Sequence, residues 1–377
     1  MIKAVFVVNK ASYFISHRLP IGIALVEKGF EVHVVAPDDC SSELVKAGFI
    51  YHQVTMSRKG KNPWNELIVI WSLVKLFKKI KPNLVHLVSI KSYLYGGIAA
   101  RIAGISSVVS AVAGLGILFS QNSLKNKLLR RTLLPIFNCA FKHKNQVVIF
   151  QNSNDRDLLV NLGVLDKDKA TLVRGAGVSL EQYPFYDEPI GIPVVSFAAR
   201  LLFDKGVSEF IEAAKILKNR GVEVEFRLIG DSDFGNKNSV PLAKIREWKD
   251  DGLVKCYGYR SDIAPLFSQS NIIAFPSYYG EGLPKVLIEA AACGRAVITT
   301  DHPGCRDAID PYETGLLVPI KDATALADSI KYLIDNPDER KAMGNKGRIL
   351  AEKEFRIEKI VDEHIHIYRN LLDKVGL

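Results

Sequence analysis

The chain has 377 residues and a formal net charge of +9. This length exceeds one ordinary hydrophobic core and suits two domains of similar size. The charge is uneven, because residues 1–185 carry 24 Lys and Arg against 11 Asp and Glu, whereas residues 186–377 carry 26 against 30. The five cysteines are scattered and lack metal-like pairing, which excludes a disulfide framework and indicates reduced thiols.

The first half of the chain has the pattern of an α/β fold. Residues 4–8 predict a short strand and show no cleavage site of a signal peptide, so the protein is expected in the cytosol. Further β-branched runs alternate with helical segments, as in a parallel sheet covered by helices. These runs are residues 31–35, 84–88, 107–112, 147–150 and 171–173.

Residues 102–124 carry no charge and are long enough to raise the question of a transmembrane span. The segment contains three glycines and five serines, and its apolar run ends at Gly114 and Gly116. A buried strand that ends in a glycine turn has this pattern. We therefore expect no membrane-spanning helix here.

A long basic stretch follows, because no acidic residue lies between Glu66 and Asp155 while twelve basic residues do. Nucleic acid is not favoured as the partner, since the stretch has no recognisable binding motif and no aromatic residues interleaved for base stacking. Residues 117–144 mix apolar and basic residues, which predicts an amphipathic helix on an anionic membrane surface. The alternative is an ordinary helix whose apolar residues turn to the core.

A proline-rich stretch at residues 183–193 predicts a linker between two domains. The α/β pattern then restarts, with apolar runs at residues 194–198, 225–229, 254–257, 272–275, 297–299 and 316–318. Two parallel-sheet units of this kind are expected to bind a ligand in a cleft at the carboxyl ends of their strands.

Two carboxylates, Glu281 and Glu289, stand eight residues apart across a predicted loop-to-helix junction, with Pro284 suited to the first helical turn. A carboxylate accepts paired hydrogen bonds from neighbouring hydroxyls, so one Glu suits a hexose and the other a ribose. A diphosphate would lie between them near the helix amino terminus. The alternative is two Glu side chains without a ligand, one solvated and one on the helix surface.

This segment resembles the E-x7-E motif of retaining glycosyltransferases of family 4, and the similarity extends over nearly the whole chain. It includes Phe275-Pro276-Ser277-Tyr278-Tyr279, Ala296-Val297-Ile298-Thr299-Thr300-Asp301, Gly304-Cys305-Arg306 and Glu313-Thr314-Gly315-Leu316-Leu317-Val318. The resemblance implies the GT-B fold, with two Rossmann-like parallel-sheet domains facing an interdomain cleft. Residues 1–185 would bind the acceptor, residues 186–357 would bind the nucleotide sugar, and a last helix within residues 358–377 would return to the first domain.

Within the family, the chain is most similar to bacterial enzymes that build O-antigen, capsule or lipid-linked oligosaccharide. The resemblance implies transfer of a hexose or N-acetylhexosamine (GalNAc, GlcNAc or Gal) from a UDP-sugar to an undecaprenyl-diphosphate-linked saccharide. The enzyme would be peripheral on the inner face of the plasma membrane. It would need no metal and no other cofactor.

Two cations follow the apolar run at residues 194–198. Arg200 can bind phosphate through two parallel hydrogen bonds, and Lys205 adds a point charge, so both can stabilise a departing nucleotide diphosphate. Glu281 would hold the transferred sugar. The resemblance also implies donor contacts from Glu289, Gly282, Leu283, Tyr259 and Arg260.

The first domain offers weaker candidates for the acceptor or the donor sugar. Many relatives carry a histidine at the position that corresponds to Val88, whereas here His86 falls within the predicted strand and Lys91 is a possible substitute. A histidine within a strand is more often a core residue. The other candidates are His17, Arg18, Gly114 and Gly116, and the glycines are equally explained by a left-handed turn.

Four other functions are considered, of which the first is disfavoured and the other three stay open. A dinucleotide-binding dehydrogenase is disfavoured, because the glycines around Gly114 lack the third member of that motif. Asp231 and Asp233 have the spacing of the D-x-D motif that holds a divalent ion in metal-dependent transferases. A sugar-nucleotide 2-epimerase would share the fold, and a non-enzymatic membrane-surface protein would share the charge.

Overall fold

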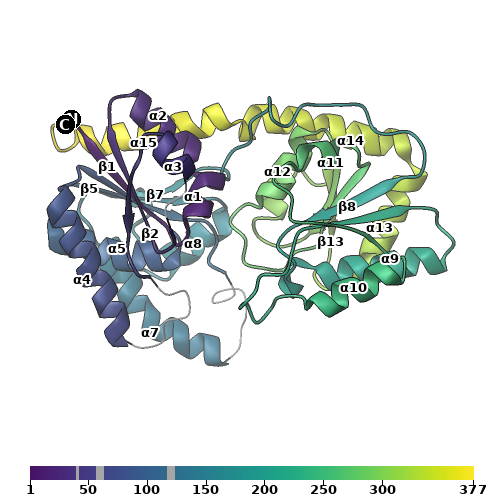
Figure 1. Cartoon of the computed structure of the whole chain (residues 1–377), viewed down its shortest axis with the longest axis horizontal. Coiled ribbons are helices and arrows are strands. Elements are labelled where there is room, and N and C mark those ends of the chain that lie inside the picture. Colours follow the sequence, from purple (N-terminus) through teal and green to yellow (C-terminus); the bar gives the residue numbers. More distant parts are fainter. Residues whose placement is uncertain (40–41, 57–62, 117–123) are drawn as a thin grey trace. The chain divides into compact units, whose positions relative to one another are not determined.

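The computed structural model describes residues 1–39, 42–56, 63–116 and 124–377 (Figure 1). These residues form two compact units, the first made of residues 1–176 and 358–377 and the second of residues 177–357. The boundary expected at 185/186 thus falls at 176/177. Among the described helices, none is long and apolar enough to cross a membrane.

The described part of the first unit contains a parallel sheet in the order β3-β2-β1-β4-β5-β6-β7. Its strands are β1 (Lys3–Val7), β2 (Glu31–Ala36), β3 (Ile50–Gln53), β4 (Leu84–Val88), β5 (Ser107–Val112), β6 (Gln146–Phe150) and β7 (Ala170–Leu172). Strand β3 is missing from the sequence prediction. It lies at the sheet edge, and its residues Tyr51, His52 and Gln53 lack the apolar run that marks the inner strands.

Helices cover both faces of this sheet, which explains why its inner strands are apolar throughout. Alternate residues of β1 enter different cores, Val5 and Val7 on one face and Ala4 and Phe6 on the other. The first core includes residues of α4 (Pro63–Ile80), α5 (Ile90–Ala103), α7 (Leu124–Phe141) and α8 (Ser153–Asn161). The second includes residues of α1 (Ala11–His17), α2 (Leu19–Glu27), α3 (Ser42–Lys46) and α15 (Ile357–Asp373).

The last helix, α15, belongs to the first unit although it ends the chain. Its buried residues Ile360, Ile365 and Tyr368 lie in the same core as β1. The Leu371 carbonyl accepts hydrogen bonds from Asn145 Nδ2 at 2.8 Å and from Ser107 Oγ at 3.2 Å. These contacts fasten the helix to the first sheet.

The predicted interfacial helix at residues 117–144 corresponds in part to α7. Residues 117–123 lie outside the described part of the chain. In the second half of α7, Phe137, Ala140 and Phe141 are buried in the core of the first unit. For these residues the alternative interpretation, a helix whose apolar side turns to the core, holds.

The described part of the second unit contains a second parallel sheet in the order β10-β9-β8-β11-β12-β13. Its strands are β8 (Val194–Ala198), β9 (Glu225–Ile229), β10 (Lys255–Gly258), β11 (Ile272–Phe275), β12 (Ala296–Thr300) and β13 (Gly315–Val318). The sequence prediction located all six within a residue or two. The helices are α9 (Val207–Asn219), α10 (Leu242–Asp250), α11 (Ala264–Ser268), α12 (Lys285–Ala292), α13 (Ala323–Asp335) and α14 (Pro337–Leu350).

The proline-rich stretch predicted as a linker is instead fastened to the second unit. The guanidinium of Arg340 binds Glu188 at 2.8 Å, and both side chains are buried. Arg295, also buried, donates hydrogen bonds to the carbonyls of Tyr186 and Asp187. Two buried arginines therefore hold residues 186–188, which explains why the boundary between the units lies earlier in the chain.

Candidate active site

The second sheet has a topological switch point between β8 and β11. From β8 the chain continues through β9 to β10 on one side, whereas β11 is followed by β12 and β13 on the other. The loops after β8 and β11 therefore diverge, and parallel α/β sheets bind ligands at the carboxyl edge at such a point. Lys205 follows β8 in a 3₁₀ turn, and Glu281 lies in the loop after β11.

Lys205 and Glu281 meet at this switch point as an ion pair between Nζ and Oε1. Each side chain is only 12% exposed. Ser277 Oγ also donates to Glu281 Oε1 at 3.2 Å, and the Lys205 ammonium lies 4.9 Å from the centre of the Tyr279 ring. The site thus combines an almost buried cation with a carboxylate that can accept hydroxyl hydrogen bonds.

Two glycines bring the surrounding loops close together. Gly206, with φ +82°, lies where an added Cβ would be 2.2 Å from the Pro276 carbonyl oxygen. Gly304, in the loop after β12, also has φ +82°, and a Cβ there would be 2.4 Å from the Gly282 carbonyl oxygen. Both positions need glycine for the backbone angle and for the close approach. The loops after β8, β11 and β12 therefore pack against one another.

Arg200, the second predicted cation, pairs with Asp233 in the loop after β9. Its Nη1 lies 2.6 Å from Asp233 Oδ2, and about half of the arginine side chain is exposed. Asp233 is one of the two aspartates of the D-x-D pattern, so in this structure its carboxylate binds a guanidinium. Within the described ranges, no group of three or more His, Cys, Asp or Glu side chains is placed to hold a metal ion.

Glu289 lies at the fifth residue of α12 and is 6% exposed. Its Oε1 accepts a hydrogen bond from the Tyr183 hydroxyl at 2.7 Å and lies 3.4 Å from Lys285 Nζ. Burial raises the pKa of the Glu289 carboxyl above its usual value. Its predicted contact with the donor ribose stays a prediction, and it would require the ligand to reach a carboxylate already bonded to Tyr183.

The remaining predicted donor contacts are divided between the core and the surface. The Leu283 side chain is buried in the hydrophobic core, so only its backbone is left to contact a ligand. Gly282 is the residue before Leu283, and its carbonyl oxygen faces Gly304 at close range. Tyr259 and Arg260 follow β10 and are exposed, and the Arg260 guanidinium binds Asp262 through hydrogen bonds of 2.8 and 2.6 Å.

In the first unit, the structure places Arg18 and His86 in the core, each 1% exposed. His86 bonds to the Tyr368 hydroxyl through Nδ1 and stacks between Phe6 and His364. Burial holds the pKa of His86 well below its usual value, so the ring is neutral. The contact of Arg18 or His86 with substrate stays a prediction, and it would require side chains that are buried here, His86 beneath α15, to become accessible.

The other candidates of the first unit lie at the carboxyl edge of its sheet. Lys91 is the second residue of α5 and forms a 2.6 Å ion pair with Glu66 of α4, so it links the two helices. His17 ends α1, where its ring stacks on Tyr13 with centres 4.3 Å apart. Gly114 and Gly116 have φ +103° and +63°, so the turn after β5 requires left-handed backbone.

Sequence analysis missed one residue at the switch point of the first sheet, between β1 and β4. Ser89, directly after β4, has φ +89°, which is rare for a residue with a Cβ. Its hydroxyl is 3.0 Å from that of Ser92 in the first turn of α5. Strained backbone of this kind clusters at functional sites. No local signal predicts it, because serine in a strand-to-helix loop is ordinary.

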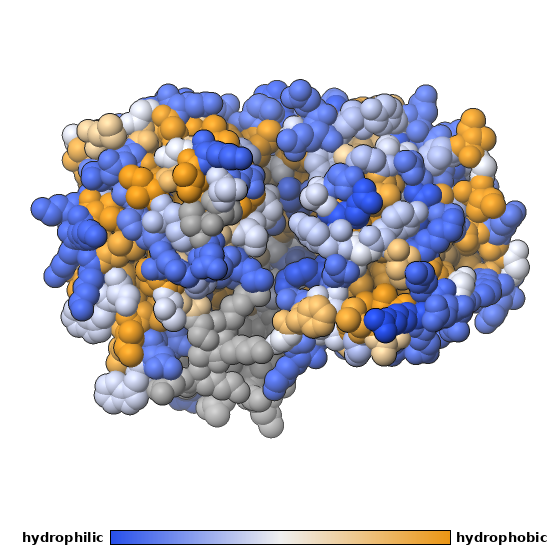
Figure 2. Space-filling model, in the orientation of Figure 1, coloured by the Kyte–Doolittle hydropathy of each residue, from blue (hydrophilic) through white to orange (hydrophobic). Residues whose placement is uncertain are grey.

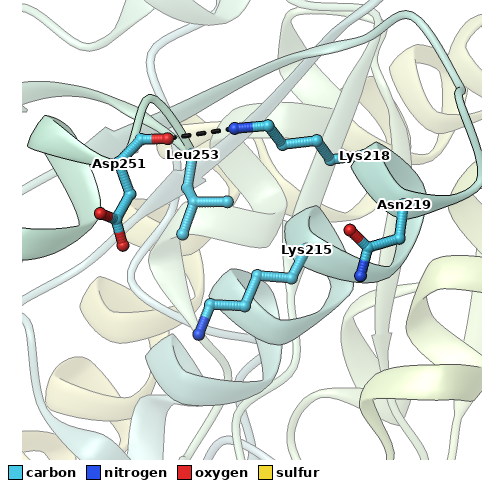
Figure 3. Close-up of a pocket in the computed structure, with 5 residues that line it drawn as sticks. All are labelled: Lys215, Lys218, Asn219, Asp251 and Leu253. Atoms are coloured by element: carbon cyan, nitrogen blue, oxygen red, sulfur yellow. Dashed lines mark hydrogen bonds between the residues drawn. The ribbon is translucent and has the colours of Figure 1, made fainter.

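A surface hollow of the second unit lies at the opposite edge of its sheet. Figure 3 shows Lys215, Lys218 and Asn219 from the end of α9 beside Asp251 and Leu253. Lys218 Nζ donates to the Asp251 carbonyl at 3.1 Å. Because α9 runs back from the carboxyl end of β8, this hollow lies by the amino ends of the strands, away from Lys205 and Glu281. It has no part in the site.

Comparisons with known proteins agree with this fold. The family model described as glycosyl transferases group 1 matches residues 184–350, and the model described as glycosyl transferase 4-like matches residues 3–152. A relative from Campylobacter jejuni is 30% identical over 95% of this chain and 96% of its own length. Its name is N,N'-diacetylbacillosaminyl-diphospho-undecaprenol alpha-1,3-N-acetylgalactosaminyltransferase.

Another relative, from Escherichia coli, is 27% identical over 80% of this chain and 79% of its own length. It is named UDP-Gal:alpha-D-GlcNAc-diphosphoundecaprenol alpha-1,3-galactosyltransferase. Among solved structures, a glycosyltransferase from Rickettsia africae superposes with a TM-score of 0.79 at 19% identity, covering 98% of each chain. The Anabaena protein HepE in complex with UDP-glucose gives 0.78 at 18% identity, covering 98% of this chain and 99% of its own.

The two parallel-sheet units have the GT-B architecture, and the family matches make the chain a sugar-transferring enzyme. The chain belongs to the family 4 glycosyltransferases, in the group whose relatives build bacterial surface and lipid-linked saccharides.

Proposed function

We propose that this glycosyltransferase moves a hexose or N-acetylhexosamine, such as GalNAc, GlcNAc or Gal, from a UDP-sugar to an undecaprenyl-diphosphate-linked saccharide. The transfer would serve bacterial surface polysaccharide synthesis, O-antigen or capsule. The names of the Campylobacter jejuni and Escherichia coli relatives support the lipid-linked acceptor, and the second also supports a UDP-sugar donor. The observation that carries the proposal is the meeting of Lys205 and Glu281 at the switch point of the second sheet.

The chemistry follows from the charges at this point. As the sugar leaves, negative charge grows on the nucleotide diphosphate, and Lys205 and Arg200 would stabilise it. The Glu281 carboxylate holds the hydroxyls of the sugar and fixes the orientation of its anomeric carbon. A diphosphate anion would compete with Glu281 for Lys205, and the carboxylate would then turn its hydrogen bonds to the sugar.

We further infer that the transfer retains the anomeric configuration. In a retaining transfer by this route, the acceptor hydroxyl attacks from the face that the phosphate leaves, and the phosphate oxygen takes the hydroxyl proton. Such a reaction needs no protein nucleophile. Positioning and fixed charges are then the contribution of the enzyme, and each commonly supplies several kcal/mol.

We infer that the reaction proceeds without a metal ion. Arg200 and Lys205 are paired with Asp233 and Glu281 in the free enzyme, and a diphosphate that displaces these carboxylates would meet two positive charges, as it would at a divalent ion. Asp233 of the D-x-D pattern is bonded to Arg200, an arrangement that suits the positioning of a cation.

A lipid-linked acceptor places the enzyme at a membrane, and we propose that it is peripheral on the inner face of the plasma membrane. The excess of basic residues in residues 1–185 supports an anionic surface as the partner.

A thermal-shift panel tests the donor side of the proposal, with UDP, GDP, CDP and NAD, each with and without EDTA. A ligand at 100 times its dissociation constant adds about 2.7 kcal/mol to stability. Stabilisation by UDP that survives EDTA is the expected result. Stabilisation by NAD alone would overturn the proposal. If incubation with a UDP-sugar and no acceptor released an epimerised UDP-sugar, the enzyme would instead be a 2-epimerase.

A further inference from the structure

Helix α4 carries an apolar stripe that the core of the first unit does not use. Its inward residues Val69, Leu73, Val74, Phe77 and Ile80 are buried in the core. On the opposite side, four large apolar residues are exposed in sequence positions three or four apart. They are Trp64 (74% exposed), Leu67 (47%), Ile68 (63%) and Trp71 (55%).

The same side of the helix becomes basic toward its carboxyl end. Lys75, Lys78 and Lys79 are exposed and continue the spacing of the apolar stripe. We call these seven residues, Trp64 to Lys79, the outward face of α4. Figure 2 shows hydrophobic and strongly hydrophilic surface side by side at the border of the first unit where Figure 1 draws α4.

No acidic residue opposes this positive charge on the outward face. Glu66 is the single acidic residue in the sequence of α4, and it turns to the protein, where it pairs with Lys91 of α5 at 2.6 Å. The pKa of Tyr95 is raised by burial and by its hydrogen bond to Glu66, so a second group of α5 holds this carboxylate. The ion pair fixes the rotation of α4 and keeps the outward face toward solvent.

We propose that the outward face of α4 docks the enzyme on an anionic lipid bilayer. Tryptophan favours the boundary between lipid headgroups and acyl chains, because its ring is apolar and its N–H needs a polar partner. Leu67 and Ile68 enter the apolar layer beside it, and the lysines lie at the level of the anionic headgroups. The docking surface proposed here is on α4, whereas in the second half of α7 the residues Phe137, Ala140 and Phe141 turn to the core.

The short length of the apolar stripe, together with the lysines beside it, favours a bilayer over a protein partner. A stripe about 10 Å long, from Trp64 to Trp71 at 1.5 Å per residue, is too short for a typical stable protein interface but long enough for interfacial insertion. This inference deepens the proposed function and rests on it, because the lipid-linked acceptor is the reason that the enzyme would need a membrane.

Tryptophan fluorescence tests the proposal directly in the full-length protein. The sequence has three tryptophans, and the third, Trp248, is buried in the core of the second unit. A blue shift on adding vesicles therefore reports on Trp64 and Trp71. We expect the shift with vesicles of phosphatidylcholine and phosphatidylglycerol, and a much smaller one with phosphatidylcholine alone or at high salt.

Vesicle flotation of variants measures the contribution of each residue type. The variant Trp64→Ser/Trp71→Ser should lower the partition coefficient about tenfold or more. Each of Lys75→Ala, Lys78→Ala and Lys79→Ala should lower it roughly fivefold at low salt. Ile349→Ser is the matched control, because Ile349 is 62% exposed on α14 of the second unit. It should bind vesicles like the unchanged protein.

Equal vesicle binding by the double tryptophan variant would overturn the proposal, as would absence of vesicle binding by the unchanged protein. A change in oligomeric state of that variant without a loss of vesicle binding would assign the stripe to self-association instead. Stabilisation by UDP checks that each variant is folded. Transfer to a water-soluble acceptor analogue by a protein that does not bind vesicles would refute the docking surface and leave the proposed function intact.

Discussion

Lys205 and Glu281 are 76 residues apart in the sequence and form an ion pair at the carboxyl edge of the second sheet. The contact exists because β8 and β11 are neighbours in the sheet, so that the turn after one strand lies beside the loop after the other. The pair brings a cation for the leaving diphosphate within reach of a carboxylate for the sugar. The testable consequences begin with these two residues.

Removing the cation should slow transfer far more than it weakens the fold. We expect Lys205→Ala to lower kcat by about 10²–10³-fold, the usual cost of losing one preorganised charge that stabilises a developing anion. Lys215→Ala is the control, because Lys215 lies on α9 at the opposite edge of the sheet. Steady-state kinetics with saturating donor measure the effect. A kcat within about twofold of the unchanged enzyme would exclude Lys205 from the chemistry.

Variants of Arg200 and Asp233 distinguish a site in which Arg200 and Lys205 bind the diphosphate from a site in which a metal ion does. Arg200→Ala should lower kcat/KM about tenfold, because a charge-assisted bond to phosphate is lost. Asp233→Asn should keep most activity and nearly all stability, since a half-exposed ion pair contributes less than about 1 kcal/mol. Activity should survive EDTA. Loss of transfer in Asp233→Asn together with EDTA sensitivity that Mg²⁺ reverses would establish a D-x-D metal site.

Substitution of Gly304 by alanine should impair transfer, because the backbone of Gly304 packs closely against the loop that carries Glu281. In Gly304→Ala the new Cβ would lie 2.7 Å from the Glu281 carbonyl oxygen, so the loop must shift. A displacement of about 1 Å at a reacting group can cost about a hundredfold in rate. Gly221→Ala is a matched control, with φ +70° and no atom within 4 Å of the added Cβ. Similar kinetics for the two variants would show that the Gly304 contact does not position Glu281.

The buried His364 predicts how stability depends on pH. Burial, with the nearby charge of Arg18, lowers the pKa of His364 to about 3 in the folded chain. Protonation is therefore easier in the unfolded chain, and the contribution of this residue is present above about pH 6.5 and lost as the pH falls toward 3. The loss amounts to at most about 1.4 kcal/mol per pH unit.

Urea denaturation at several pH values measures this slope. His364→Leu should lose less stability on acidification than the unchanged protein, although the buried His86 still contributes in the same direction. His366→Leu, at an exposed position of the same helix, should keep the original slope. If the slope of His364→Leu matches that of His366→Leu, then His364 is not neutral in the folded chain.

The sequence was sufficient to predict the two sheets and the loops that carry Glu281, Lys205 and Arg200. Inner parallel strands are apolar on both faces, so β4, β5, β8, β9 and β11 are predicted with their observed ends. Long-range contacts carry no such local signal. The burial of His86 depends on Tyr368, 282 residues later, and the pairing of Asp233 with Arg200 depends on the adjacency of β8 and β9.

The exposed stripe of α4 was also beyond sequence reasoning. An apolar run such as Leu67-Ile68-Val69-Ile70-Trp71 can turn either side to the core, and only the packing of α4 on α5 shows which residues remain outside. The net charge predicted that the first half of the chain has an anionic partner. It did not show where that partner would bind.

Product analysis tests the central claim most directly. The enzyme would be incubated in EDTA with a panel of UDP-hexoses and UDP-N-acetylhexosamines and a short-chain polyprenyl-diphosphate-linked saccharide, and the product analysed by mass spectrometry and NMR. The account predicts a product heavier by one sugar, in the same anomeric configuration as the donor, that is lost in Lys205→Ala. An inverted linkage, a requirement for metal, or an epimerised nucleotide sugar in place of a saccharide product would contradict it.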